Sequence, residues 1–177
     1  MPHQSIKSIV IRYSILLAIG LIVLLSYSLI YQILSPLTTY PSYFILNLFY
    51  NASLAGLNEI IINDASIILI PACIGISAYI LFLILNLTTP MNLKAHLKAL
   101  FFAFILFYIL NIIRIIIFSA LFIEGYSYFN IAHILFWYFG STILVILIWF
   151  ISMRLFKIKS IPLYDDLKFI VSKIKLR

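Results

Sequence analysis

The chain has 177 residues, of which 65% are hydrophobic and 10% charged, and its mean hydropathy is +1.19. A soluble domain of this size cannot bury so much apolar surface, so the composition excludes an ordinary soluble protein and indicates an integral membrane protein. The net charge is +7, but no aromatic and basic RNA-binding motif is present. We therefore expect no nucleic-acid partner and interpret the basic residues as topology determinants and contacts to anionic lipid headgroups.

Four segments are apolar and long enough to cross a membrane as helices. They are about Tyr13–Leu34, Ala72–Thr88, Leu97–Leu121 and Ile131–Met153. The first is longer than the core of a signal peptide and no small-residue cleavage site follows it, so we interpret it as a retained helix. The sequence thus predicts an all-α polytopic membrane protein. Residues 1–153 form one membrane-embedded domain, and residues 154–177 form a basic tail along the membrane surface.

The Lys and Arg residues predict the orientation of these four helices. Eleven of the twelve basic residues precede the first segment, separate the second from the third, or follow the fourth. Both termini are then cytoplasmic, because basic residues stay on the cytoplasmic side of a membrane. The two external connections hold Glu59, Asp64 and Glu124 and no Lys or Arg.

A fifth apolar stretch, residues 40–57, would place the basic tail outside if it crossed the membrane. We therefore expect an interfacial or re-entrant helix on the outer face there, beginning near Pro41. The next stretch, 58–70, has two β-branched runs around Asn63 and Asp64, which is typical of a short β-hairpin. A single helix beginning at Ala65 is the alternative, but it would contain Pro71, which suits a helix start better.

One basic residue, Arg114, lies inside the third segment. Its position is about seven residues below the outer end of the helix, or roughly 10 Å at ~1.5 Å per residue. A central arginine costs about 2.5–3.5 kcal/mol on insertion scales, so intramembrane charges commonly mark a functional site. The predicted topology brings two more reactive side chains to the same outer layer: Cys73 near the start of the second segment and His133 near the start of the fourth, where Asn130 is a candidate N-cap.

These three residue types can carry out nucleophilic catalysis together. A thiolate is a good nucleophile, and a helix N-terminus or a nearby cation favours its formation at Cys73. His133 can accept and return protons near neutral pH. Arg114 can stabilise the thiolate or the oxyanion of a tetrahedral intermediate, and Asn111, on the same helix face, can orient its guanidinium. A single cysteine excludes an intramolecular disulfide and a Cys-based zinc site, and we expect no cofactor or metal.

Three short motifs resemble those of the exosortase/archaeosortase family of membrane-embedded cysteine transpeptidases. "PACIGISAY" is similar to the family's nucleophile segment, "NIIRI" to its Asn-x-x-Arg-Ile, and "AHILFW" to its third motif. The chain differs at Ile74, where the family usually has Ser. The resemblance implies that residues 1–153 are a minimal catalytic domain, with Cys73, Arg114 and His133 as its catalytic residues.

The resemblance also implies a substrate: exported surface proteins whose C-terminal sorting signal ends in a transmembrane helix and a basic end. The enzyme would cleave beside that helix at the outer face of the cell membrane. A thioacyl intermediate would then pass to an amine acceptor, with a membrane lipid as the candidate, or to water. Two alternatives remain open from the sequence. One is a non-catalytic scaffold or assembly factor in which Arg114 binds a lipid phosphate and Cys73 merely packs, and the other is a small transporter.

Overall fold

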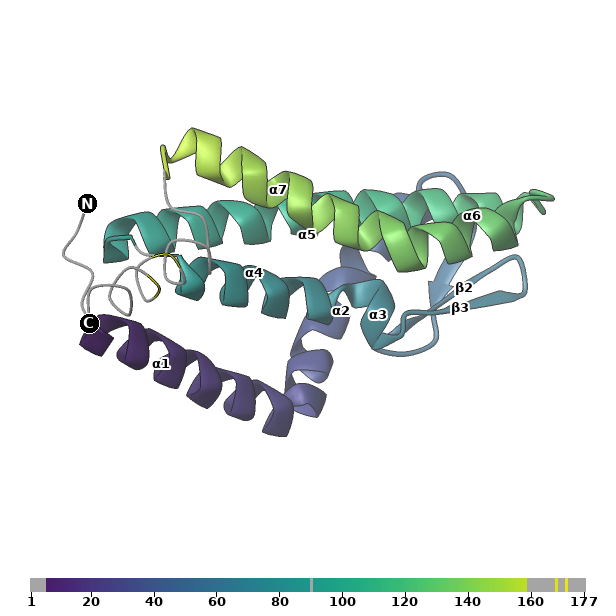
Figure 1. Ribbon diagram of the computed structural model, residues 1–177. Coiled ribbons are helices and arrows are strands. Elements are labelled where there is room, and N and C mark those ends of the chain that lie inside the picture. Colours follow the sequence, from purple (N-terminus) through teal and green to yellow (C-terminus); the bar gives the residue numbers. More distant parts are fainter. Residues whose placement is uncertain (1–5, 90, 159–167, 169–170, 172–177) are drawn as a thin grey trace.

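The computed structural model describes residues 6–89 and 91–158, together with 168 and 171. Helices run along the length of the molecule, and a small sheet lies at one end, which we call the sheet end (Figure 1). The helices are α1 Ile6–Leu25, α2 Tyr27–Asn47, α3 Pro71–Ile74, α4 Ile76–Thr88, α5 Leu93–Ile123, α6 Phe129–Leu135, the π-helical η1 Phe136–Gly140 and α7 Ser141–Leu155. The strands are β1 Ala52–Leu54, β2 Glu59–Ile62 and β3 Ala65–Ile68. Most of the predicted basic tail, 154–177, lies outside the described residues, and so does its expected path along the membrane.

The first predicted helix is broken. The chain bends by 73° between α1 and α2, so the expectation of one continuous helix over Tyr13–Leu34 is wrong. Ser26, at the break, has a ψ of 11° and departs from helical geometry. Hydroxyl groups of α2 then donate to carbonyls of the sheet region: Tyr31 to Leu69 and Ser35 to Leu57. These bonds fix the new direction of α2 across the other helices (Figure 1).

Helix α2 also replaces the expected interfacial helix over residues 40–57. It starts at Tyr27, passes through Pro41 and ends at Asn47, and residues 52–54 form a strand, so the expected bounds of that helix are wrong. A proline within a helix leaves the carbonyl four residues earlier without its N–H partner. Here the Tyr108 hydroxyl of α5 donates to that carbonyl, Leu37 O, over 2.7 Å. A tertiary contact therefore supplies the hydrogen bond that Pro41 removes.

The predicted β-hairpin is confirmed, and the alternative helix from Ala65 is wrong. Strands β2 and β3 pair antiparallel, with Ile62 opposite Ala65. The two turn residues, Asn63 and Asp64, have φ of 47° and 66°. A two-residue hairpin turn of this kind needs positive φ at both positions, which Asn and Asp tolerate better than most residues. Strand β1, which the sequence did not reveal, adds to the other side of β2 and completes a sheet of order β1-β2-β3.

The second predicted helix is divided at Gly75. Pro71 opens the single turn of α3, Gly75 takes the left-handed conformation with φ of 83°, and α4 continues from Ile76. A continuous helix over Ala72–Thr88 is therefore a wrong expectation. A Cβ on Gly75 would lie 2.7 Å from the ring of Phe107 on α5. Both the backbone angle and the close ring require glycine at this position.

The third and fourth predicted helices, Leu97–Leu121 and Ile131–Met153, are confirmed as helical. Helix α5 and the run from α6 to α7, Phe129–Leu155, are long and apolar enough to cross a membrane. Among the described residues the bent pair α1–α2 would make a third such unit, whereas α4 is shorter. The N-cap of α6 is Tyr128 rather than the expected Asn130, which lies inside the first turn.

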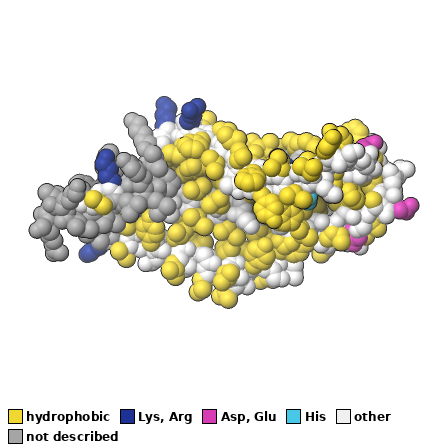
Figure 2. Space-filling view, turned by 45° about the vertical axis from the view of Figure 1, so that its right-hand side comes forward, with side chains coloured by type: hydrophobic (Ala, Val, Ile, Leu, Met, Phe, Trp, Pro, Cys, Tyr) yellow, Lys and Arg dark blue, Asp and Glu magenta, His cyan; other side chains and the backbone are white. Residues whose placement is uncertain are grey.

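Helices α4, α5 and α7 share an apolar core that includes Phe82, Phe107 and Ile148, each 1% exposed. A second core lies between α2 and the sheet, where Leu46, Ile60 and Ile62 are fully buried. Much of the remaining helical surface is apolar and exposed. On the face shown in Figure 2, Lys and Arg side chains gather at one end and Asp and Glu side chains at the sheet end.

Replacing Gly75 by alanine is expected to lower the thermal unfolding midpoint in detergent. The left-handed backbone and the Phe107 ring together would cost about 1–3 kcal/mol. Gly20→Ala is the matched control, because nothing lies within 4 Å of its added Cβ and alanine favours the interior of α1. A Gly75→Ala protein that unfolds at or above the wild-type temperature would contradict this account of the break.

Candidate active site

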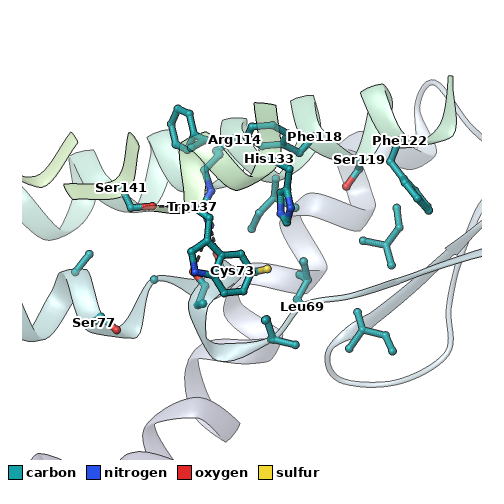
Figure 3. A pocket seen from close by; sticks show the side chains of 18 of the residues that line it. Leu69, Cys73, Ser77, Arg114, Phe118, Ser119, Phe122, His133, Trp137 and Ser141 are labelled. Atoms are coloured by element: carbon teal, nitrogen blue, oxygen red, sulfur yellow. Dashed lines mark hydrogen bonds between the residues drawn. The ribbon is translucent and has the colours of Figure 1, made fainter. Parts of the chain in front are cut away.

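A cavity of about 450 Å³ lies where α3, α5, α6 and β3 meet. All three residues that the sequence singled out as catalytic, Cys73, Arg114 and His133, line it (Figure 3). They come from α3, α5 and α6 and are about 40 and 20 positions apart in the sequence. The structure therefore brings together the three candidate residues in one cavity.

Cys73 lies in the single turn of α3, where its backbone N–H donates to the carbonyl of Ile70 over 2.8 Å. The side chain is half-buried and its thiol is free. In Figure 3 the sulfur points away from the guanidinium of Arg114 and into the cavity. The thiol is thus placed to meet a molecule that enters the cavity.

Arg114 binds the turn that carries the cysteine. Its Nη2 donates to the carbonyl of Cys73 over 2.8 Å and to that of Ala72 over 3.4 Å. Its Nη1 donates to Oγ of Ser141 over 2.9 Å, and its guanidinium lies 5.9 Å from the ring centre of Phe136. Backbone and hydroxyl oxygens are therefore its partners, and its charge lies beside the backbone of Cys73.

Asn111 has a different role from the expected one. Its Nδ2 donates to the carbonyls of Cys73 and Ile74, at 3.0 and 3.1 Å, rather than orienting the guanidinium of Arg114. The expectation was wrong because Asn111 and Arg114, which are three residues apart on α5, both donate to the carbonyl of Cys73 instead of bonding to each other. Asn111 is 2% exposed, and its buried Oδ1 has no hydrogen-bond partner among the residues that the structure describes. Asn111 is therefore a positioning residue for the α3 turn.

His133 sits among aromatic rings at the opposite side of the cavity. Its imidazole stacks on Phe129 with ring centres 5.4 Å apart and planes 10° apart. Phe118 and Trp137 contact it edge to face, at 5.4 and 5.7 Å. Phe129, His133 and Trp137 follow one another at four-residue intervals on one helix face, so packing against α5 and within α6–η1 holds the ring over the cavity.

Sequence reasoning missed Ser141, which accepts a hydrogen bond from Arg114. Ser141 could have been found as a hydroxyl group in the next apolar segment, at a depth similar to that of Arg114, because polar side chains in apolar helices commonly hydrogen-bond across to a neighbouring helix. It also missed the contribution of β3, because its residues Ser66, Ile67 and Ile68 line the cavity. Their involvement follows from the hairpin folding back beside α3.

No protein-family model, curated protein or solved structure matches this chain. The arrangement of side chains therefore has to carry the functional argument. A thiol, an imidazole and a guanidinium-braced turn around one apolar cavity form a set suited to nucleophilic attack on a carbonyl group.

Removing the amide of Asn111 is expected to loosen the turn that carries Cys73. Asn111→Ala leaves two buried carbonyls with one donor fewer, which would cost about 1–3 kcal/mol of stability. The readouts are the thermal unfolding midpoint and the rate at which iodoacetamide labels Cys73, and both should change. Ser119→Ala is the matched control: this buried residue of α5 also lines the cavity but has no hydrogen bond within the described part of the chain. Equal behaviour of the two variants would show that Asn111 does not position the turn.

Proposed function

We propose that this protein is a membrane-embedded cysteine transpeptidase that removes the C-terminal sorting signal of exported proteins. The observation that carries the proposal is that Cys73, Arg114 and His133, distant in sequence, line one cavity. The resemblance of the three motifs to the exosortase/archaeosortase family points to the same residues and supplies the substrate class. The acceptor is an amine, with a membrane lipid headgroup as the candidate.

The proposed topology has four crossings, formed by α1, α3–α4, α5 and α6–α7. Helices α1, α4, α5 and α7 run lengthwise beside one another in Figure 1, and α4 contacts the other three. The end opposite the sheet carries the basic residues near α1, α5 and α7, so it faces the cytoplasm together with both termini. The sheet end and the cavity then lie toward the outer face of the cell membrane.

In the first half-reaction, His133 accepts the proton of the Cys73 thiol across the cavity through an intervening water molecule, and the thiolate attacks the carbonyl carbon of the scissile peptide bond. The C–N bond of the tetrahedral intermediate breaks, and His133 gives its proton to the departing amine. The products are a thioester on Cys73 and the free C-terminal helix of the substrate. This division of one difficult step into two is the advantage of covalent catalysis.

In the second half-reaction, an amine nitrogen attacks the thioester carbonyl. The C–S bond breaks as the new C–N bond forms, and His133 passes the proton of the amine to the thiolate of Cys73. Arg114 holds the turn throughout through the Cys73 carbonyl and Ser141, and its charge favours the thiolate at that position.

A non-catalytic membrane scaffold is the second candidate. One observation favours it: Arg114 already has backbone and hydroxyl partners, so its presence in the membrane has a structural explanation without catalysis. The two candidates differ in what they require of the thiol, because a scaffold needs no nucleophile at position 73.

The processing of exported proteins tests the proposal. We expect Cys73→Ala and Cys73→Ser to lower the processing rate by about 10³-fold or more, since loss of a nucleophile removes the covalent pathway. Membrane proteins from cells that express each variant would be compared by gel shift and by mass spectrometry of their C-terminal peptides. Substrates should keep their C-terminal helix only with the cysteine variants. Gly20→Ala, far from the cavity, is the control variant.

Equal thermal unfolding midpoints for wild type and Cys73→Ser would show that the variant folds. If both cysteine variants process as wild type does, the transpeptidase proposal is wrong and the scaffold remains. Arg114→Gln adds a second comparison: it should slow both processing and the labelling of Cys73 by iodoacetamide, whereas a scaffold predicts only the change in labelling that a loosened turn causes, which Asn111→Ala measures separately.

A further inference from the structure

Each outer edge of the small sheet, at β1 and at β3, has no further strand beside it within the described residues. The strand order is β1-β2-β3, so β3 pairs with β2 on one side only. A free edge presents unpaired N–H and C=O groups, and it is a ready template for another extended chain. Natural proteins often cover or charge such an edge, but Ser66 and Ile68 are exposed and residues 66–68 carry no charge of their own. The Ser66 hydroxyl donates to the carboxylate of Glu59 on the neighbouring strand β2.

The register identifies the backbone groups that face this edge. In a hairpin with a two-residue turn, the residues that flank the turn, Ile62 and Ala65, exchange hydrogen bonds, and every second pair along the ladder does the same. Leu69 continues this alternation, because its N–H donates to the carbonyl of Asn58 over 2.7 Å. The backbone N–H and C=O groups of Ser66 and Ile68 therefore point away from β2.

The free edge is a wall of the cavity that holds Cys73. Five consecutive residues, 66–70, line that cavity. Consecutive residues of a strand place their side chains on opposite faces of the sheet, so their joint presence means that the strand lies edge-on to the cavity. Across the cavity, α5 and α6–η1 contribute aromatic side chains: Phe118, Phe122, Phe129 and Phe136.

The edge also leads directly to the candidate nucleophile. The chain stays extended through Ile70, which has φ of −76° and ψ of 165°, and α3 begins at Pro71. Cys73 is thus three residues beyond the extended segment. A chain that lay along β3 and continued past Ile70 would arrive beside Cys73.

We propose that the substrate polypeptide binds in extended conformation as a fourth strand along the free edge of β3, with its scissile bond at Cys73. This inference rests on the proposed function and specifies how that site holds its substrate. Backbone hydrogen bonds to Ser66 and Ile68 supply the binding energy independently of substrate sequence, and the aromatic wall receives alternate side chains of the added strand.

The proposed topology also gives the direction of the added strand. Strand β3 runs from the turn at Asn63 and Asp64, at the sheet end, toward Cys73. A substrate whose exported part lies outside and whose C-terminal helix lies in the membrane runs the same way, so the pairing is parallel. The edge from Ser66 to Ile70 spans about 13 Å at ~3.3 Å per residue. It therefore contacts about five substrate residues that precede the scissile bond.

A reactive peptide tests the inference without knowledge of the natural substrate. The probe is acetyl-Thr-Val-Thr-Val-Ala chloromethyl ketone, from which the thiolate of Cys73 displaces chloride to form a thioether. We expect it to label the full-length protein at least 10-fold faster than acetyl-Ala chloromethyl ketone. A series of pentapeptide probes, each with one N-methylated peptide bond, maps the contacts. N-methylation should abolish the faster labelling only at every second position, because only alternate N–H groups of an added strand face β3.

A pair of protein variants gives a second measurement. Ile68→Pro removes an N–H that faces the cavity edge, and an edge strand tolerates proline where its N–H is not paired. Leu54→Pro is the matched control, because the alternation in β1 places the N–H of Leu54 at the opposite edge of the same sheet. Only Ile68→Pro should slow labelling by the pentapeptide, by about 10-fold, while iodoacetamide labels wild type and both variants at similar rates.

The possible outcomes separate this inference from the function on which it rests. Strand addition would be overturned if the pentapeptide and the single-residue probe labelled Cys73 at equal rates. It would also be overturned if N-methylation slowed labelling equally at every position, even where Cys73→Ala abolishes processing. An alternating pattern with normal processing by the cysteine variants would support a peptide-binding edge and refute the transpeptidase. If Ile68→Pro unfolds, the N-methyl series on the wild-type protein still decides the question.

Discussion

The carbonyl oxygen of Cys73 is the acceptor on which the arrangement of the cavity depends. It receives hydrogen bonds from both Arg114 and Asn111, at 2.8 and 3.0 Å, and both donors belong to α5. A helix of four residues cannot satisfy its own carbonyls, so α3 relies on α5 to do so. Hydrogen bonds to a charged group contribute about 1.5–3 kcal/mol each, which offsets much of the cost of an arginine in an apolar segment.

Helix α5 organises the rest of the molecule in the same manner. The Tyr108 hydroxyl donates to the Leu37 carbonyl, which has no helical partner because of Pro41, and this hydrogen bond fixes α2. The ring of Phe107 packs on Gly75 and fixes the break before α4. One long helix thus positions the bent pair, the cysteine turn and the core. The spacing in "NIIRI" gains a physical meaning from this: residues three apart on α5 lie on one face and reach a single carbonyl.

The cavity joins the proposed nucleophile, Cys73, to the β3 edge that we propose holds a peptide. Cys73 and His133 line it from opposite sides, and the edge of β3 forms the wall between the sheet end and the thiol. These features agree with chemistry on a polypeptide backbone, for which an extended chain and a nearby thiolate are the basic requirements. In the proposed topology, the separation of charge between the two ends of the molecule turns this site toward the outer face of the membrane.

The sequence by itself determined the long apolar helices, including those that carry Arg114 and His133, the β-hairpin and the three residues that line the cavity. Long apolar runs, a two-residue Asn-Asp turn and a lone charge within an apolar run are local signals that the sequence displays without knowledge of the fold. Only the tertiary structure decided the bend at Ser26, the helical path through Pro41, the partners of Asn111 and the part played by Ser141. Each of these depends on a hydrogen bond or a packing contact from a distant segment, and no local pattern records which distant group will satisfy a given carbonyl.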